Sequence, residues 1–427
     1  MTANKPNVIF IITDQQRAST LGCYRMNDKV ETPAIDRLAE DGIRFTSCYA
    51  SQPVCSPSRS SIVTGLYPNA TSVIDNCNPH TGFFLPADRF SWLRQMHENG
   101  YTVCNIGKWH LGVSRRPIPE YFDVWHGFET GWGHWIINEP TFPEPGEIQT
   151  GDDQPKTVPK AEGRYRIDED TDFAIDFMER NRDNPFALLV SYYPPHGPKT
   201  ARAEDIEFYG DRIEPLQQAV YHAMVRRIDY NVGRIVEAVD SLGLREDTII
   251  IFTSDHGENY PLRWNQHNKR LCYDQSANVP LIISWPGEID RGRTIDNVMS
   301  NVDFAPTILD LCGLDWPDDL HGMSAKDLVH DDSSGWHRDV MIQNNPYRMW
   351  DAELRDMRER CLVTDDWKLI VNNMRQPELF RRHTQELPEE NRYEDEEETA
   401  RRLSERLADL GERTGDSLTK DILNQWS

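Results

Sequence analysis

Two apolar stretches of the sequence each end in a pair of side chains that could bind a metal ion. The run NVIFIIT is followed by Asp14 and Gln15, and the run DTIIIFTS is followed by Asp255 and His256. Open α/β sheets place ligand-binding groups just beyond the carboxyl ends of their strands, so two central strands would bring these four side chains together. Carboxylates and an amide suit a hard divalent cation such as calcium or magnesium, with the histidine an unusual addition. Read singly, an aspartate after a strand is often only a cap or a turn residue.

One cysteine stands in a setting that neither a packed thiol nor a disulfide explains. The stretch SQPVCSPSRSSIVTGLYP places Cys55 two residues before a proline and four before Arg59, in a small polar turn ahead of a helix-like segment. A thiol beside a positive charge can be reactive, because the charge favours the thiolate. The usual role of a free cysteine is instead that of a small packed hydrophobe. The 8 cysteines include no CxxC pair, so mostly free thiols are expected.

The elements that must position these residues alternate between strand and helix. Apolar runs indicate strands at 7–12, 101–107, 186–193 and 247–254, and helical spacing occupies the stretches between them. Such alternation predicts an α/β fold with a large mixed, mostly parallel central sheet flanked by helices. Strands inside such a sheet are buried on both faces, which explains why VIFII and IIIF show no polar alternation.

The character of the sequence changes after about residue 334. The runs RDVMIQNN, RCLVTDDWKLIVNN and PELFRR predict a small antiparallel sheet, and Leu403, Leu407 and Leu410 have the spacing of an amphipathic helix. We therefore predict a catalytic α/β domain over 1–334 and a C-terminal subdomain over 335–427. The stretch 136–163, rich in proline, glycine and charge, predicts either a surface insertion or a loop that faces the substrate.

Composition and charge limit the partners of this chain. A length of 427 residues with 38% hydrophobic content indicates a globular protein, and a formal net charge of −24 disfavours nucleic acid as a partner. No segment approaches the ~18 apolar residues of a membrane span, and no signal-peptide pattern is seen, so we expect no membrane partner and a cytoplasmic location. An anionic substrate would need a local positive pocket, because the overall field opposes its approach.

Seven motifs in order along the chain resemble those of the type I sulfatase family. CSPSR followed by TGLYP resembles the family signature, and NVIFIITDQQR, GKWHLG, PPHGP, SDHGE and HNKRLCYDQSANVPL resemble its further elements. PELF with LPEEN resembles its closing motif, so the resemblance runs from about residue 6 to 395. It implies an alkaline-phosphatase-like fold and hydrolysis of a sulfate monoester to an alcohol and inorganic sulfate.

The resemblance also implies a modified nucleophile and a metal. In that family the motif cysteine is converted after translation to formylglycine (3-oxoalanine), whose hydrate is a geminal diol. Its maker here would be a formylglycine-generating or sulfatase-maturing enzyme, and the metal would be calcium, with magnesium as the alternative. The implied metal ligands are Asp14, Gln15, Cys55, Asp255 and His256, and the implied catalytic residues are Cys55, Arg59, Lys108, His110, His196 and Lys269.

Each implied catalytic residue has a role in that chemistry. Lys108 and Lys269 neutralise sulfate oxygens, and Arg59 steadies the aldehyde hydrate. His196, alone or with Lys269, protonates the departing alcohol, and His110 removes a proton from the diol when sulfate leaves. Taken singly, these lysines and histidines could equally be ordinary surface or core residues.

Two other functions stay open at this point. A phosphodiesterase or phosphonate monoester hydrolase of the same superfamily uses a similar metal and nucleophile, although the complete CSPSR and GKWHLG motifs favour sulfate. An inactive carbohydrate-binding relative would lack a metal or base residue, and no such position is lost here. The sequence does not distinguish aryl, sugar, glycosaminoglycan and choline sulfates, nor does it indicate an oligomeric state. Asn76, Asn78 and His80 follow the nucleophile segment and are candidates for the leaving-group pocket.

Overall fold

The computed structural model describes most of the chain. The described residues are 5–24, 29–78, 81–112, 120–129, 134–136, 164–210, 212–213, 216–259, 269–330, 335–336, 338–345 and 356–426. Of the stretch 136–163, everything after residue 136 lies outside them, as does His80.

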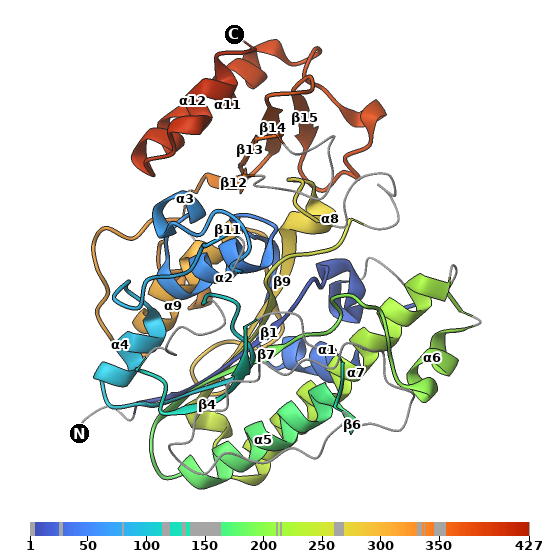
Figure 1. Cartoon of the computed structure of the whole chain (residues 1–427), viewed down its shortest axis with the longest axis vertical. Helices are drawn as coiled ribbons and strands as arrows, with labels where there is room; N and C mark the ends of the chain where they lie inside the picture. The colour runs from blue at the N-terminus through green and yellow to red at the C-terminus, as the bar shows by residue number, and fades with distance from the viewer. Residues whose placement is uncertain are drawn as a thin grey trace. The chain divides into compact units, whose positions relative to one another are not determined.

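Nine strands within the described residues form a mixed, mostly parallel central sheet (Figure 1). Strands β1, β7, β8, β3 and β4 run parallel, whereas β9 pairs antiparallel with β8. This arrangement confirms the predicted fold class. The order across the sheet is β10 (Arg293–Ile295), β2 (Ile43–Tyr49), β9 (Asn278–Ser284), β8 (Thr248–Ser254), β1 (Asn7–Thr13), β7 (Phe186–Tyr192), β3 (Thr102–Lys108) and β4 (Val124–Phe128), with β11 (Met299–Ser300) beside β2.

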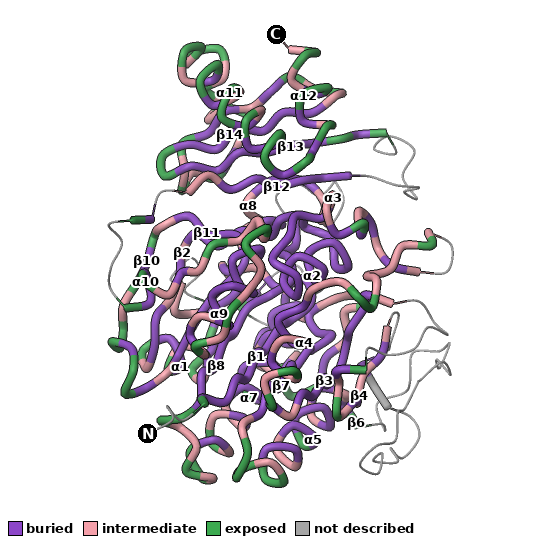
Figure 2. Tube along the Cα trace, turned by 90° about the vertical axis from the view of Figure 1, so that its left-hand side faces the viewer, coloured by how far each residue is buried: buried purple, intermediate pink, exposed green. Residues whose placement is uncertain are grey.

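Strand β1 lies between β7 and β8 and is buried along its whole length (Figure 2). Its register pairs Thr13 with Ser254 of β8 and with Tyr192 of β7. Because parallel strands end at the same edge of a sheet, Asp14 and Asp255 follow neighbouring strand ends. The sheet therefore supplies the placement that the sequence predicts for these two carboxylates.

Helices cover both faces of β1. Ile9 and Ile11 belong to a core that also contains the apolar stripes of α1 (Pro33–Glu40), α5 (Arg166–Asn181) and α7 (Leu216–Ser241). Phe10 points to the opposite face, because side chains alternate along a strand, and its ring lies 5.8 Å from that of Trp92 in α4 (Trp92–Glu98). The remaining elements of this part of the chain are α6 (Ala203–Gly210) and the short pair β5 (Trp135–Ile136) and β6 (Arg164–Tyr165).

The contacts within the chain define two units that interleave in the sequence. The first unit comprises Met1–Thr46, Trp92–Ser254 and Pro280–Ile295, and the second comprises Ser47–Ser91, Asp255–Val279 and Asp296–Ser427. These two units differ from the division that the sequence predicts, which is a single boundary after residue 334. That boundary stays a prediction. The second unit contains the helices α2 (Cys55–Thr64), α3 (Pro68–Thr71), α8 (Asp274–Ala277), α9 (Phe304–Leu311) and α10 (Lys326–Val329).

The C-terminal part of the second unit contains the predicted antiparallel sheet, which has four strands, and the predicted helix, which a second helix not predicted from the sequence follows. Its strands are β12 (Val340–Asn344), β13 (Glu359–Val363), β14 (Trp367–Asn372) and β15 (Glu378–Arg381). The run RCLVTDDWKLIVNN forms two of these strands, because the chain reverses where Thr364 N donates to Trp367 O. Helix α11 (Glu397–Arg413) buries Leu403, Leu407 and Leu410 in one core with α12 (Ser417–Leu423).

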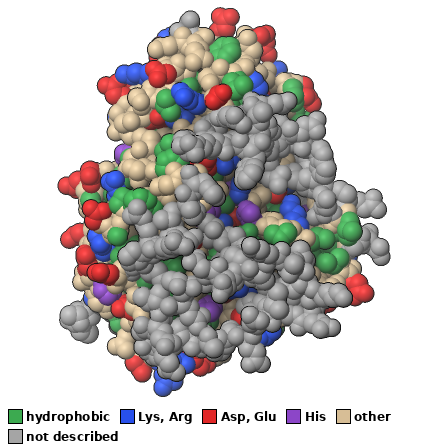
Figure 3. All heavy atoms as spheres, in the orientation of Figure 1, with side chains coloured by type: hydrophobic (Ala, Val, Ile, Leu, Met, Phe, Trp, Pro, Cys, Tyr) green, Lys and Arg blue, Asp and Glu red, His purple; other side chains and the backbone are tan. Residues whose placement is uncertain are grey.

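The described helices contain no span that is both long and apolar enough to cross a bilayer. The cytoplasmic location stays a prediction. Where the structure describes the face drawn in Figure 3, acidic and basic side chains are intermixed on the surface.

Gly107, within the GKWHLG motif, lies where β3 comes closest to β7. Its φ is 82°, and a Cβ atom there would overlap the carbonyl oxygen of Ser191. We expect Gly107→Ala to lower the free energy of unfolding by about 3 kcal/mol, because strain and overlap add. Gly243, with a φ of 70° and no atom within 4 Å of such a Cβ, is the matched control, and its alanine variant should cost only about 1 kcal/mol. Equal losses of stability in denaturant unfolding would contradict the close approach of β3 and β7.

Candidate active site

Cys55 is the first residue of helix α2, which is buried along its whole length. Pro57 fits the first turn, where its missing N–H would have no partner in the helix, and Gly65 with a φ of 74° ends the helix. The spacing of four residues puts Cys55 and Arg59 one turn apart on the same side of the helix. The CSPSR motif thus presents a thiol and a guanidinium in one direction.

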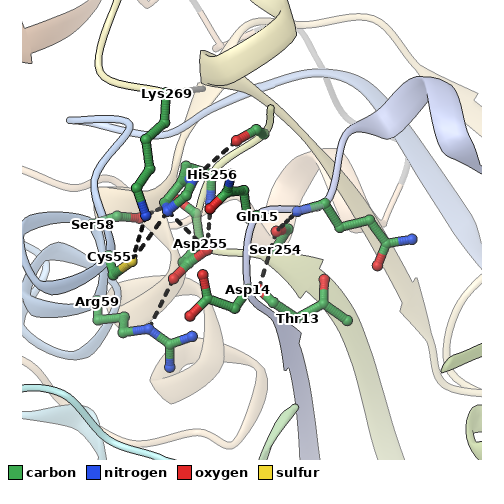
Figure 4. A network of polar contacts seen from close by, with 12 residues as sticks. Thr13, Asp14, Gln15, Cys55, Ser58, Arg59, Ser254, Asp255, His256 and Lys269 are labelled. Atoms are coloured by element: carbon green, nitrogen blue, oxygen red, sulfur yellow. Dashed lines mark hydrogen bonds and ion pairs between the residues drawn. The ribbon is translucent and has the colours of Figure 1, made fainter. Parts of the chain in front are cut away.

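The sulfur of Cys55 is surrounded by polar groups of its own unit. Lys269 Nζ donates a hydrogen bond to Cys55 Sγ at 3.2 Å, and His256 Nε2 lies 3.3 Å from the same sulfur. Figure 4 shows both side chains converging on the sulfur. Only 1% of Cys55 is exposed, so these groups, and not solvent, determine its chemistry.

Asp255 is fully buried and is held from two sides. Arg59 Nε donates to Asp255 Oδ2 at 2.9 Å, and Ser58 Oγ donates to the main-chain oxygen of Asp255. Asn301 Nδ2 in turn donates to Ser58 Oγ at 2.8 Å. Helix α2 therefore positions Asp255 as well as Cys55.

His256 has its ring orientation determined by the main chain. Its Nδ1–H donates to Gly257 O at 2.9 Å, which leaves Nε2 directed toward Cys55. Burial is the largest effect and by itself lowers the pKa of His256, but the Asp255 carboxylate and the Cys55 sulfur together outweigh it and the pKa is raised. A metal cation at Nε2 would displace the proton that this raised pKa favours.

Asp14 and Lys108 form a buried ion pair in the first unit. Asp14 is fully buried and Lys108, the last residue of β3, is 2% exposed. The Lys108 ammonium also lies 5.2 Å from the centre of the Tyr193 ring, a cation–π distance. Gln15 has a left-handed backbone with a φ of 69°, and its main-chain oxygen accepts a hydrogen bond from Tyr221 OH at 2.8 Å.

Two histidines of the first unit lie in loops that follow strands. His110 is 6% exposed and has a φ of 58°. His196 stacks on Tyr193 with 5.0 Å between ring centres, and its Nδ1–H donates to Gly197 O at 2.7 Å. Its Nε2 therefore remains the nitrogen that can exchange a proton with a ligand.

Three ligand atoms of the second unit come together. Cys55, Asp255 and His256 each offer one, and these atoms all lie within 4.8 Å of one another. A carboxylate oxygen suits calcium or magnesium, and the Nδ1–H of His256 is already donated to Gly257 O, so its Nε2 can carry the lone pair that a ligand needs. The residues present fit a divalent cation.

The sequence profile named Sulfatase matches residues 6–314. The chain belongs to the sulfatase family. The profile of the N-sulphoglucosamine sulphohydrolase C-terminal region matches residues 263–413 of this sulfatase. Both the resemblance seen in the sequence and the predicted enzyme class, a sulfuric ester hydrolase, are thereby confirmed.

Two relatives match this sulfatase over most of their own length. The uncharacterized sulfatase YidJ of Escherichia coli is 29% identical over 422 residues, which cover 88% of this chain and 81% of that protein. An N-acetylglucosamine-6-O-sulfatase of Bacteroides thetaiotaomicron is 26% identical over 466 residues, covering 86% and 78% respectively.

Solved structures share its fold. One protein, in complex with its substrate D-glucosamine-2-N,6-O-disulfate, has a TM-score of 0.78 at 23% identity and covers 97% of this chain and 99% of its own. A phosphonate monoester hydrolase of Agrobacterium radiobacter has a TM-score of 0.75 at 22% identity and covers 96% of both chains. These two likenesses show the fold alone.

The structure adds two supporting residues of this sulfatase that the sequence reading missed. Glu129 Oε2 accepts a hydrogen bond from Gly112 N at 2.9 Å at the end of the GKWHLG motif, and burial raises the pKa of Glu129 to about 7. His134 Nε2 donates to His196 O at 2.9 Å, and burial lowers the pKa of His134 to about 4. Both lie in the stretch of aromatic residues after GKWHLG, where no local motif distinguishes them.

Most residues singled out in the sequence lie in direct contact with one another. Cys55 contacts His256 and Lys269, Arg59 contacts Asp255, and Lys108 contacts Asp14. The burial and backbone conformation of His110 and the contacts of His196 do not test a catalytic role, so their roles, like those of the other residues, stay predictions.

Proposed function

We propose that this sulfatase hydrolyses a sulfate monoester to an alcohol and inorganic sulfate, with residue 55 acting as the nucleophile in its formylglycine form. One observation carries the proposal. The Cys55 sulfur lies at the start of a buried helix, within reach of Lys269 and His256, in a group of metal-ligating atoms that includes those of Asp255 and His256. In the modified residue, the sulfur position would be taken by an oxygen of the aldehyde hydrate.

The modification and the metal would supply what ordinary side chains lack. The hydrate of formylglycine at position 55, produced by a maturation enzyme, would supply one hydroxyl as nucleophile and a second for the release of sulfate. Calcium, or magnesium in its place, would be held by Asp14, Gln15, Asp255, His256 and residue 55, and would supply positive charge and lower the pKa of the hydrate.

The chain's own cations would stabilise the sulfate group. In the proposed site, Lys108, Lys269 and Arg59 would supply three positive charges against the carboxylates of Asp14 and Asp255, each of which is fully buried. Buried cations act strongly on an anion because little water screens them. This local excess of positive charge would oppose the formal net charge of −24.

Two histidines would move the protons. His196 would protonate the departing alcohol from Nε2, since its Nδ1–H is donated to Gly197 O. His110 would remove a proton from residue 55 in the step that releases sulfate. Glu129 and His134 would act through them, by holding the loops that carry His110 and His196.

A sulfated sugar is the substrate class we propose. One relative is an N-acetylglucosamine-6-O-sulfatase, and one protein of the same fold has D-glucosamine-2-N,6-O-disulfate as its substrate. A phosphodiesterase or phosphonate monoester hydrolase activity is the second candidate, supported by a phosphonate monoester hydrolase of the same fold.

Parallel assays of sulfur and phosphorus esters test the reaction. We expect kcat/KM for 4-nitrophenyl sulfate to exceed that for bis(4-nitrophenyl) phosphate and for a phenyl phosphonate monoester by about 100-fold or more. The inverse ratio would establish the phosphorus reaction instead. Binding of a sulfated sugar without turnover, with residue 55 still a cysteine in protein from its native host, would indicate a carbohydrate-binding protein.

A further inference from the structure

Arg270, the residue after Lys269, has a backbone conformation that a large side chain rarely adopts. Its φ is 89°, in the region that glycine enters without cost. Such strain is maintained only where the surrounding structure imposes it, and it concentrates at functional sites. An arginine at a position that would suit glycine indicates that its side chain has a role.

The Arg270 side chain forms an ion pair with Asp75. Arg270 NH2 donates to Asp75 Oδ1 at 3.0 Å, and the side chains of Arg270 and Asp75 are 16% and 4% exposed. The main-chain nitrogen of Arg270 also donates to Pro53 O at 3.1 Å. The pair is therefore largely buried, and only the arginine keeps an appreciable part of its surface in solvent.

The chain connects the pair to Lys269, which contacts the reactive sulfur, and to Ser56, the residue after Cys55. Lys269, which precedes Arg270, donates to Cys55 Sγ at 3.2 Å. Asn76, which follows Asp75, accepts a hydrogen bond from Ser56 N at Oδ1, at 3.2 Å. Covalent continuity therefore places Asp75 and Arg270 beside the residues that contact Cys55 and Ser56.

Each member of the pair has hydrogen-bonding capacity that the described residues do not use. Arg270 NH1 is buried and has no hydrogen-bond partner among them, and the hydrogen bonds of Asp75 all use Oδ1. A buried cationic donor without an acceptor is costly, so an oxygen of a ligand would relieve that cost.

The charge of the pair indicates which ligand fits. An aspartate and an arginine together are neutral, so a further anion would meet the Asp75 carboxylate as well as the guanidinium. A hydroxyl group both donates and accepts, so two neighbouring hydroxyls can give a hydrogen bond to Asp75 Oδ2 and take one from Arg270 NH1. Neighbouring hydroxyls of this kind are a property of sugar rings, and a nitrophenyl leaving group has none.

We propose that Asp75 and Arg270 bind two adjacent hydroxyl groups of the sugar that carries the sulfate. The pair is then a determinant of specificity, and it selects sugar sulfates over aryl sulfates. This inference rests on the proposed sulfatase reaction and deepens it by naming residues that bind the leaving alcohol.

The test is the ratio of kcat/KM for a sugar sulfate to kcat/KM for 4-nitrophenyl sulfate. The sugar probes are the 6-sulfates of N-acetylglucosamine and galactose, of which the better substrate is used. Arg270→Gly removes the side chain and keeps the backbone unstrained, and Asp75→Ala removes the partner. We expect each variant to lower the ratio by about 30-fold, since a lost hydrogen bond to a charged group costs that order.

Controls separate the sugar-binding role from a structural one. Arg406→Ala breaks another ion pair of the same unit, in which Arg406 Nε donates to Asp339 Oδ2 at 2.8 Å, and it should leave the ratio unchanged. Variants of the Asp75 pair that lose both activities equally would show a scaffold role and overturn the inference. A wild-type enzyme that hydrolyses the aryl ester but neither sugar would also overturn it, while leaving the sulfatase reaction intact. Protein with a verified aldehyde at residue 55 and no activity on any sulfate ester would instead refute the proposed function itself.

Discussion

Replacing Cys55 with alanine is expected to lower kcat for sulfate ester hydrolysis by about 10,000-fold, the order seen when a nucleophile is removed. The variant loses the nucleophile and leaves Lys269 and His256 without the group on which they converge. The Cys55→Ser variant should have a different defect from that of the alanine variant. A serine hydroxyl can be sulfated but has no second hydroxyl to expel the sulfate, so at most one equivalent of product should appear.

The modification itself is measured on the tryptic peptide FTSCYASQPVCSPSR, residues 45–59. We expect an aldehyde at residue 55 and an alkylatable thiol at Cys48. Cys48 is fully buried in β2 and burial raises the pKa of its thiol well above the usual value, so it is an internal control in the same peptide.

The alanine variant at Cys48 should keep full activity, because Cys48 forms no side-chain hydrogen bond with those residues assigned to catalysis that the structure describes. A wholly thiol peptide from the native host would contradict the mechanism, as would a Cys55→Ala variant with wild-type kcat. The same peptide from a foreign host would show only that the maturation enzyme was absent.

Removal of divalent metal with a chelator is expected to lower kcat by about 1,000-fold and to lower the unfolding temperature. Two fully buried carboxylates, Asp14 and Asp255, then lose a cation that compensates their charge. Calcium added back at 1,000 times its Kd should stabilise the folded state by about 4 kcal/mol. Calcium and magnesium titrations of the unfolding temperature would identify the preferred ion.

The Asp14→Asn variant tests the proposed metal site, because it removes the charge of residue 14 and keeps the shape of the side chain. The variant should lose the calcium-dependent rise in unfolding temperature, and it should be less stable even without metal, because Lys108 is left as a buried charge without its carboxylate. Asp303→Asn is the matched control, since Asp303 is fully buried and paired with Arg338 at 2.8 Å outside the ligand group. It should lose stability yet keep the calcium response. A wild-type unfolding temperature that responds to neither ion would contradict the metal site.

The sequence by itself determined the main elements of the fold and named the candidate site residues, whose roles stay predictions. The apolar runs of β1 and β8 and the spacing of Leu403, Leu407 and Leu410 are local patterns, and burial of one face or two is enough to produce them. The motifs around Cys55 and Lys108 are likewise continuous in the chain. Candidate site residues that lie within a few positions of one another in the sequence could therefore be predicted without knowledge of the fold.

Only the tertiary structure decided which of these residues contact one another. Lys108 lies 94 positions from Asp14, and Arg59 lies 196 positions from Asp255, so their pairing depends on strand order and not on any local pattern. The interleaved units, the antiparallel direction of β9 and the Asp75–Arg270 pair have the same origin. The physical reason is that the periodicity of apolar residues reflects how far each residue is buried. Which residue becomes its partner inside the core depends on long-range packing.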